Sequence, residues 1–200
     1  MNKRLALITV LLFGLGVVLA SCAGMQAKPS EENFKDPVIR FESFMVPQYD
    51  GYWYYGAKIK PTKGDAGDHG APLPMTFLFS IENPNPYPVL LEDYMFTVAF
   101  DMDFNLVTVN NQDSCWIPAG KTNHVRATTL ITVRSALLSL LVTGGYKLKE
   151  RGWSPWDALA KWWKGVPESA VSVLIDEGAF TFSADGVTKV VAYKALIPSE

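Results

Sequence analysis

Two runs of alternating hydrophobic and polar residues stand on either side of residues 83–88. Their apolar positions recur at every second residue: Met75, Phe77, Phe79 and Ile81 before the segment, and Tyr94, Phe96, Val98 and Phe100 after it. A period of two places these side chains on one face of an extended chain, the pattern of a strand with one buried face. The pattern therefore predicts two strands, over residues 75–82 and 89–101.

The segment between these runs reads Asn83-Pro84-Asn85-Pro86-Tyr87-Pro88. Its three prolines lack an N–H group and cannot donate to a ladder of strands. Each proline also favours extended geometry in the residue before it, and the asparagine side chains can pair with nearby main-chain groups. We interpret the segment as a corner at which the chain leaves one sheet and crosses to the other. The alternative, a proline-rich surface loop, does not account for the alternation on both sides.

Shorter runs predict further strands. They cover residues 38–46, 104–109, 123–133, 170–176, 179–184 and 187–197. Asp176-Glu177-Gly178 is predicted to join two of them as a turn, and Asp185-Gly186 is typical of a tight hairpin. Regular short strands separated by turn residues favour an all-β fold. We expect an immunoglobulin- or fibronectin-III-like β-sandwich of about seven or more strands, with one or two short helices.

Two segments are predicted to be helical. In the first, Ser135 can cap an apolar run over residues 136–142, which Gly144-Gly145 is expected to stop. This helix is too apolar to be exposed on all sides, so we expect it to plug the open end of the sandwich. The second helix has Ser154 as its predicted N-cap and Gly165 at its end.

Tryptophan residues define one face of this second helix. Trp153, Trp156 and Trp163 fall within one arc of the helical projection, whereas Trp162 falls outside it and is expected to be exposed. This face either packs on the domain or forms a surface for the membrane or a partner. Trp combined with Lys is the composition of helices that lie at a membrane interface.

The region around the Asn-Pro-Asn corner resembles a known family, the late embryogenesis abundant type 2 domain, also called the water stress and hypersensitive response (WHy) domain. The similarity covers residues 75–145, with a weaker continuation at 169–197. The resemblance implies a sandwich fold and a role in desiccation or water stress. It gives Asn83, Pro84, Asn85 and Pro86 a structural role and supplies no catalytic motif.

The N-terminus has the features of a secretory signal peptide. Lys3 and Arg4 precede a short apolar run, and Leu19-Ala20-Ser21-Cys22 closes it. This ending resembles a bacterial lipobox, which implies cleavage before Cys22, a diacylglyceryl thioether on its sulfur and a further acyl chain such as palmitate on its amine. A transmembrane anchor is disfavoured because the apolar run is short for a bilayer.

These signals divide the chain into three parts. Residues 1–21 form the signal peptide, 22–36 a flexible lipid-anchored tether, and 37–200 one sandwich domain with insertions near 49–74 and 146–167. Lipidation at Cys22 predicts a location in the cell envelope. Ala23 follows it, and without an Asp at this position the periplasmic face of the outer membrane is favoured in an organism with two membranes.

Charge and cysteine content narrow the classes of partner. Removing residues 1–21 takes away two of 18 basic residues and no acid, which leaves 16 against 20 acidic residues and a net charge near −4. A net negative charge without a basic patch argues against nucleic acid as a binding partner. Cys115 is then the only thiol besides Cys22, so no internal disulfide is predicted. We expect a buried Cys115 side chain, with an exposed reactive thiol or an intermolecular bridge as the alternative.

Residues 49–74 depart from what the family resemblance implies. Five aromatic side chains cluster there: Tyr49, Tyr52, Trp53, Tyr54 and Tyr55. They either form a hairpin over one end of the sandwich or an exposed surface for a partner, a glycan or membrane headgroups. Asp65, Asp68 and His69 follow in a Gly-rich loop, but their spacing matches no calcium loop. We predict no metal site.

No catalytic constellation is present. His69 and His124 are the only histidines, and neither has a triad-like context. We predict no enzyme activity and no cofactor. Three functions remain: a stress-protective lipoprotein, an accessory or scaffold subunit of an envelope complex, and a carrier of a lipid or other apolar ligand. The carrier would hold its ligand in a slot between the sheets lined by Phe77, Phe79, Phe96 and Phe100.

Overall fold

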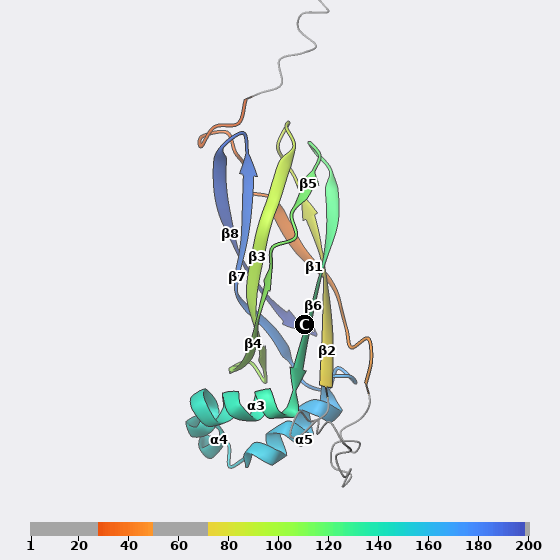
Figure 1. Ribbon diagram of the computed structural model, residues 1–200, viewed down its shortest axis with the longest axis vertical. Coiled ribbons are helices and arrows are strands. Elements are labelled where there is room, and N and C mark those ends of the chain that lie inside the picture. Colours follow the sequence, from red (N-terminus) through yellow and green to blue (C-terminus); the bar gives the residue numbers. More distant parts are fainter. Residues whose placement is uncertain (1–27, 50–71, 199–200) are drawn as a thin grey trace, which may run out of the picture.

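The computed structural model describes residues 28–49 and 72–198 as two antiparallel sheets packed face to face, with helices at one end of the sandwich (Figure 1). Its strands are β1 (Val38–Met45), β2 (Pro72–Glu82), β3 (Val89–Phe100), β4 (Phe104–Asn111), β5 (Cys115–Ile117), β6 (Thr122–Thr132), β7 (Val173–Ala184) and β8 (Val187–Ile197). Its helical segments are α3 (Val133–Ser139), the π-helical turn η2 (Leu140–Gly144), α4 (Gly145–Glu150) and α5 (Pro155–Gly165).

The strand order confirms the predicted all-β sandwich. One sheet has the order β1-β2-β6, and the other has the order β4-β3-β7-β8, with β5 also paired to β3. Because β2 and β3 belong to different sheets, residues 83–88 are the crossing between them, as predicted. The pairing of β2 with β6 brings Pro72 opposite Thr132, so β2 runs from the helical end to the Asn-Pro-Asn corner.

The predicted inward faces form the core. The apolar alternate positions of β2 and β3 are fully buried or nearly so. Phe79 lies at their centre and packs edge-on against Phe96 and Phe180, with ring centroids 5.6 Å apart in each pair. Edge-to-face rings add attraction beyond the burial of their area, so the two sheets are joined by interlocked aromatic side chains.

One predicted turn is a bulge within a strand. Residues 176–178 were expected to join two strands, but β7 continues through them, and its pairing with β8 shifts register between Ile175 and Gly178. Glu177 has a φ of 52°, and a Cβ on Gly178 would lie 2.5 Å from the Tyr193 carbonyl oxygen. The acidic and glycine residues of the segment therefore serve a β-bulge. The Asp185-Gly186 hairpin is confirmed.

The first helix differs from the prediction at both ends. Thr132 rather than Ser135 is the N-cap, and Ser135 completes a capping box by bonding back to Thr132. The helix then continues through Gly144 and Gly145 to Glu150. Both glycines keep right-handed helical dihedrals, whereas a glycine stop needs a left-handed residue. Gly152, with a φ of 66°, supplies that conformation after the helix.

Candidate functional site

The Asn-Pro-Asn corner lies at the end of the sandwich opposite the helices (Figure 1). Burial alternates along it: Asn83, Asn85 and Tyr87 are buried, while Pro86 and Pro88 are exposed. The period-two pattern of the strands thus continues through the corner. The exposed prolines need no hydrogen-bond donor, and the two asparagines turn inward.

Asn83 holds the corner in shape and joins it to strand β5. Its Nδ2 donates to the Tyr87 carbonyl oxygen at 2.8 Å and to the Ile117 carbonyl oxygen at 3.0 Å. Its Oδ1 accepts from the main-chain N–H of Asn85 at 3.0 Å. Because Asn83 is fully buried, each of these bonds satisfies a group that has no access to water.

Asn85 binds the main chain of a residue far away in the sequence. Its Oδ1 accepts from the Lys35 N–H at 2.8 Å, and its Nδ2 donates to the Lys35 carbonyl oxygen at 2.8 Å. The Asn85 Nδ2 also donates to the Asn83 Oδ1 at 3.0 Å. One amide side chain therefore hydrogen-bonds to both main-chain polar groups of Lys35, as a neighbouring strand would.

The segment that contains Lys35 packs onto the corner. Phe34 is 2% exposed, and its ring stands edge-on to Tyr87 with a centroid distance of 6.2 Å. The Tyr87 hydroxyl donates to the Asn33 Oδ1 at 2.9 Å, and Lys189 Nζ donates to the Phe34 carbonyl oxygen at 2.6 Å. We call residues 30–36 the docked segment.

The docked segment corrects the predicted boundary of the tether. Residues 22–36 were expected to be flexible throughout, but residues 30–36 are fixed by Asn85, Tyr87 and Lys189. The burial of this segment could not be predicted from its composition, because a single Phe in a polar stretch forms no periodic pattern. The buried partner of Phe34 lies more than 50 residues away. Phe34 itself was the available signal.

The chemistry of the corner is architectural. Burial raises the pKa of Tyr87, and the nearby positive charge of Lys189 opposes this shift. The phenol therefore stays protonated and can donate to Asn33. The corner contains amides, carbonyls and prolines but no nucleophile paired with a base. What it can do is hold a chain segment in place.

The Trp face of α5 is largely part of the core. Trp163 is fully buried, and Trp153 is half-buried with its ring stacked on Phe104 at 6.4 Å. Trp156 is 49% exposed. Of the three predicted surface residues, only Trp156 offers much of its side chain to solvent. Tyr52, Trp53, Tyr54 and Tyr55 lie outside the described residues.

The prediction for Trp162 was wrong. Its side chain is fully buried, its Nε1 donates to the Asp101 Oδ2 at 2.7 Å, and its ring packs edge-on to Phe100 at 5.6 Å. The helix lies across the end of the sandwich, so the adjacent residues Trp162 and Trp163 are both covered. The helical projection alone did not show how much of the α5 surface would be covered by the sandwich. Asp101 directly follows the buried strand β3 and was the one available hint.

The remaining predicted sites have these outcomes. Phe77, Phe79, Phe96 and Phe100, which were predicted to line a slot for an apolar ligand, are all fully buried. Phe77 and Phe79 each pack edge-on against Phe96, and Phe100 packs edge-on against Trp162. Cys115 is half-buried, and burial raises the pKa of its thiol. His124 is exposed.

Residues 28–49 and 72–198 contain no group of three or more His, Cys, Asp or Glu side chains placed to hold a metal ion. Asp65, Asp68 and His69 lie outside these ranges. Within them, no helix has the length and apolar character needed to cross a bilayer.

Comparison with known proteins gives only distant likenesses. No family model and no curated protein matches the chain. A protein from Archaeoglobus fulgidus is 7% identical, with a TM-score of 0.40 over 81% of this chain and 92% of that one. A candidate ApaA protein from Bordetella pertussis is 9% identical, with a TM-score of 0.41 over 82% and 94%. A candidate late embryogenesis abundant protein is 10% identical, with a TM-score of 0.38 over 98% and 87%. Likenesses of this size carry no conclusion about family or function.

Proposed function

We propose that this chain is a lipid-anchored, non-enzymatic protein of the cell envelope that protects the envelope during water loss. The lipobox-like ending at Cys22 supports the anchor. The Asn-Pro-Asn corner, through its resemblance to WHy domains, supports the role in water stress. In an organism with two membranes, the periplasmic face of the outer membrane is the proposed location.

One observation carries the proposal: the corner that bears the family resemblance also binds the segment that leads to Cys22. Asn85 holds both main-chain groups of Lys35. Lys28 follows Cys22 by six positions in the chain, and even a fully extended chain of six steps reaches only about 20 Å. The corner would therefore lie near the membrane surface. The strands, of 11 and 12 residues in β2 and β3, would place the helices about 35–40 Å further away.

Survival after drying and after hyperosmotic shock tests this function. A deletion strain is complemented with the natural chain, with Cys22→Ala and with Cys115→Ala as the matched cysteine control. We expect the natural chain and Cys115→Ala to restore survival and Cys22→Ala to fail. Equal survival of the deletion and parent strains would refute the protective role, and full rescue by Cys22→Ala would refute the need for the anchor.

A further inference from the structure

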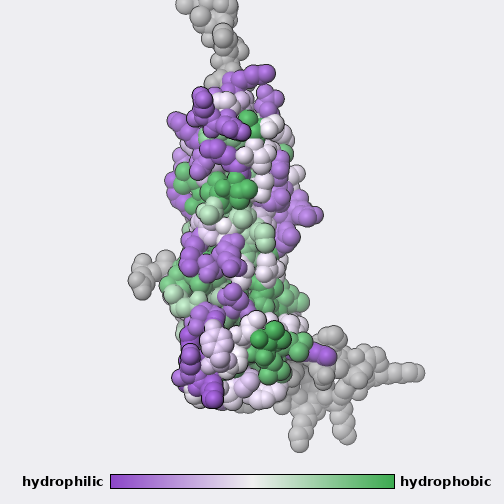
Figure 2. Space-filling model, turned by 90° about the vertical axis from the view of Figure 1, so that its left-hand side faces the viewer, coloured by the Kyte–Doolittle hydropathy of each residue, from purple (hydrophilic) through white to green (hydrophobic). Residues whose placement is uncertain are grey.

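Apolar side chains are exposed at both ends of the sandwich. At the corner end, Trp116 of β5 is 59% exposed, whereas its neighbour Ile117 is fully buried, so the indole lies on the outer face of its sheet. At the helical end, Val142 is 82% exposed. Figure 2 shows the side on which β7 and β8 lie, with hydrophilic residues over most of the surface and apolar clusters in its upper half and at the helical end.

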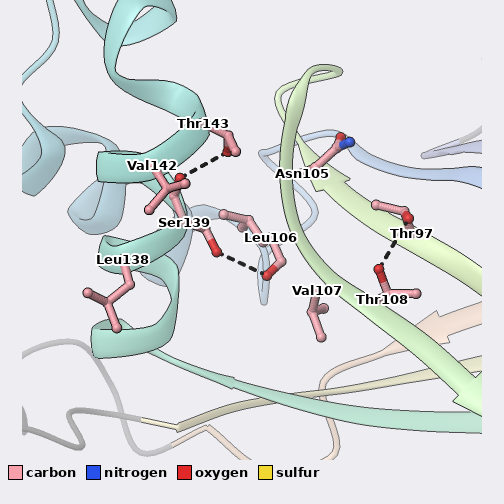
Figure 3. Close-up of a pocket in the computed structure, with 9 residues that line it drawn as sticks. All are labelled: Thr97, Asn105, Leu106, Val107, Thr108, Leu138, Ser139, Val142 and Thr143. Atoms are coloured by element: carbon pink, nitrogen blue, oxygen red, sulfur yellow. Dashed lines mark hydrogen bonds between the residues drawn. The ribbon is translucent and has the colours of Figure 1, made fainter.

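The helical end has the larger apolar surface. A groove of about 420 Å³ lies there between the helix and β4 (Figure 3). Leu138 and Val142 line it from the helix, and Leu106 and Val107 line it from β4. If apolar area alone decided which end meets a bilayer, the helical end would be chosen. It is therefore the natural comparison for the corner end.

The position of the anchor favours the corner end. Lys28 Nζ lies 4.0 Å from Asp185 Oδ2 in the hairpin between β7 and β8, and the Lys28 carbonyl oxygen accepts from Asn33 Nδ2 at 2.8 Å. Six steps of chain lead from Lys28 back to Cys22, which allow at most about 20 Å. The helices lie about 35–40 Å from the corner along β2 and β3. Val142 could then reach the bilayer only in a domain that lies flat.

Trp116 belongs to an uncharged row of side chains across the outer face of its sheet. Leu90 pairs with Trp116 on β5 and with Ser183 on β7, and Ser183 pairs with Thr188 on β8. We call these four residues the Trp116 row. Toward the corner the row is followed by the exposed Pro88, which is also uncharged. An indole among neutral side chains suits the headgroup region, where Trp is enriched because one part of it is apolar and its N–H is polar.

Carboxylates mark the other border of this surface. Asp93 pairs with Thr181 beyond the Trp116 row, and Glu177, which accepts from the Thr97 hydroxyl at 3.2 Å, lies further toward the helices. A domain lying flat on this face would remove both carboxylates from water, which is costly. Contact with a bilayer is therefore confined to the Trp116 row and the corner.

Charge at the corner end selects the lipid. Three ion pairs are formed there: Lys28 with Asp185, Lys189 with Asp36, and Arg40 with Glu82. The exposed charges that remain beside the corner are two basic and two acidic residues, Lys35, Lys121, Glu31 and Glu32. Attraction to anionic lipid needs an excess of basic residues near the surface. Without that excess, the surface suits zwitterionic headgroups.

We propose that the Trp116 row lies against the bilayer that holds Cys22, with the indole among zwitterionic phospholipid headgroups. The inference rests on the lipid anchor of the proposed function and adds a second, non-covalent contact beside it. A surface tethered so close to the bilayer meets it at a high effective concentration. A small contact area is then enough to determine which face of the sandwich turns toward the lipid.

Quenching of tryptophan fluorescence by brominated lipid tests the proposal with the full lipidated chain. The vesicles contain phosphatidylethanolamine and phosphatidylcholine, with bromine atoms near the headgroup end of the acyl chains. We expect quenching of the natural chain and at least threefold less quenching of Trp116→Phe. Trp156→Phe, the matched change at the exposed indole of the helical end, should keep the full effect. Both sites are exposed, so the Tm should stay unchanged.

Flotation of the vesicles separates failure of the contact from failure of the anchor. A chain that floats with the vesicles but is not quenched, or is quenched equally without Trp116, would overturn the contact and leave the anchor intact. Quenching that is lost in Trp156→Phe would place the helical end on the bilayer and overturn it as well. Quenching that appears only when phosphatidylglycerol is added would contradict the zwitterionic surface. A chain that does not float would refute the anchor and, with it, the proposal.

Discussion

The two ends of the sandwich are closed by different kinds of chemistry. At the corner, the buried amides of Asn83 and Asn85 satisfy main-chain groups of Tyr87 in the corner itself, of Ile117 in β5 and of Lys35 in the docked segment. At the helical end, the indoles of Trp162 and Trp163 are covered by hydrophobic packing. Polar closure depends on a few directional bonds, whereas apolar closure depends on buried area. The two ends should therefore respond differently to substitution.

Removal of one indole from the helical end should have the largest effect. Trp162→Ala leaves a cavity next to Phe100 and removes the bond to Asp101. We expect a loss of about 3–5 kcal/mol in the free energy of unfolding, measured with urea. Trp156→Ala is the matched control at a 49% exposed site and should change the value by about 0.5 kcal/mol. Similar losses for both variants would show that Trp162 is not part of a packed core.

At the corner, the loss of one amide should cost somewhat less. Asn83→Leu keeps the approximate volume of the side chain but leaves carbonyls of Tyr87 and Ile117 without a donor. Each buried group left unpaired costs about 1–3 kcal/mol, so we expect a total loss of about 3 kcal/mol. The exposed Asn110→Leu serves as the control and should be close to neutral. An unchanged stability of Asn83→Leu would contradict the polar account of the corner.

Asn85→Ala should act locally, on the docked segment. Removal of the amide frees the Lys35 N–H and carbonyl oxygen. Hydrogen exchange of the Lys35 amide should then become at least tenfold faster, equivalent to about 1.4 kcal/mol of lost protection, while amides in β3 keep their rates. Lys189→Met provides a second test, since it removes the bond to the Phe34 carbonyl oxygen. If exchange at Lys35 is already unprotected in the natural chain, the docked segment does not exist in solution.

The smallest effect is expected at the start of α5. Ser154→Ala removes the N-cap and should lower the Tm by about 2–4 °C at pH 7. Hydrogen bonds from the Ser154 side chain and main chain lower the pKa of Asp157 from its ordinary value of 3.8. The carboxylate's contribution is thus present above that value and is lost as the pH falls through the lower folded pKa. The Tm difference should shrink in acid, and a constant difference would exclude Asp157 from the cap.

Features set by local pattern could be predicted from the sequence. Alternation placed Phe77 and Phe96 in the core, and the prolines located the crossing between the sheets. Capping residues gave the start of α5 at Ser154. Contacts between distant segments could not be predicted in this way. Phe34 packs against Tyr87, and Trp162 binds Asp101. Neither contact produces a periodic pattern in the sequence, because each depends on how two distant segments meet in the fold.

The orientation of the domain at the membrane is the most direct test of the account. The lipidated protein is reconstituted in vesicles with an energy-transfer acceptor on the lipid headgroups. A donor dye is attached at Lys121→Cys near the corner or at Glu150→Cys at the helical end, with Cys115 replaced by Ser. We predict strong transfer from position 121 and weak transfer from position 150. Equal transfer from both positions, or stronger transfer from position 150, would contradict a domain anchored through its Asn-Pro-Asn corner.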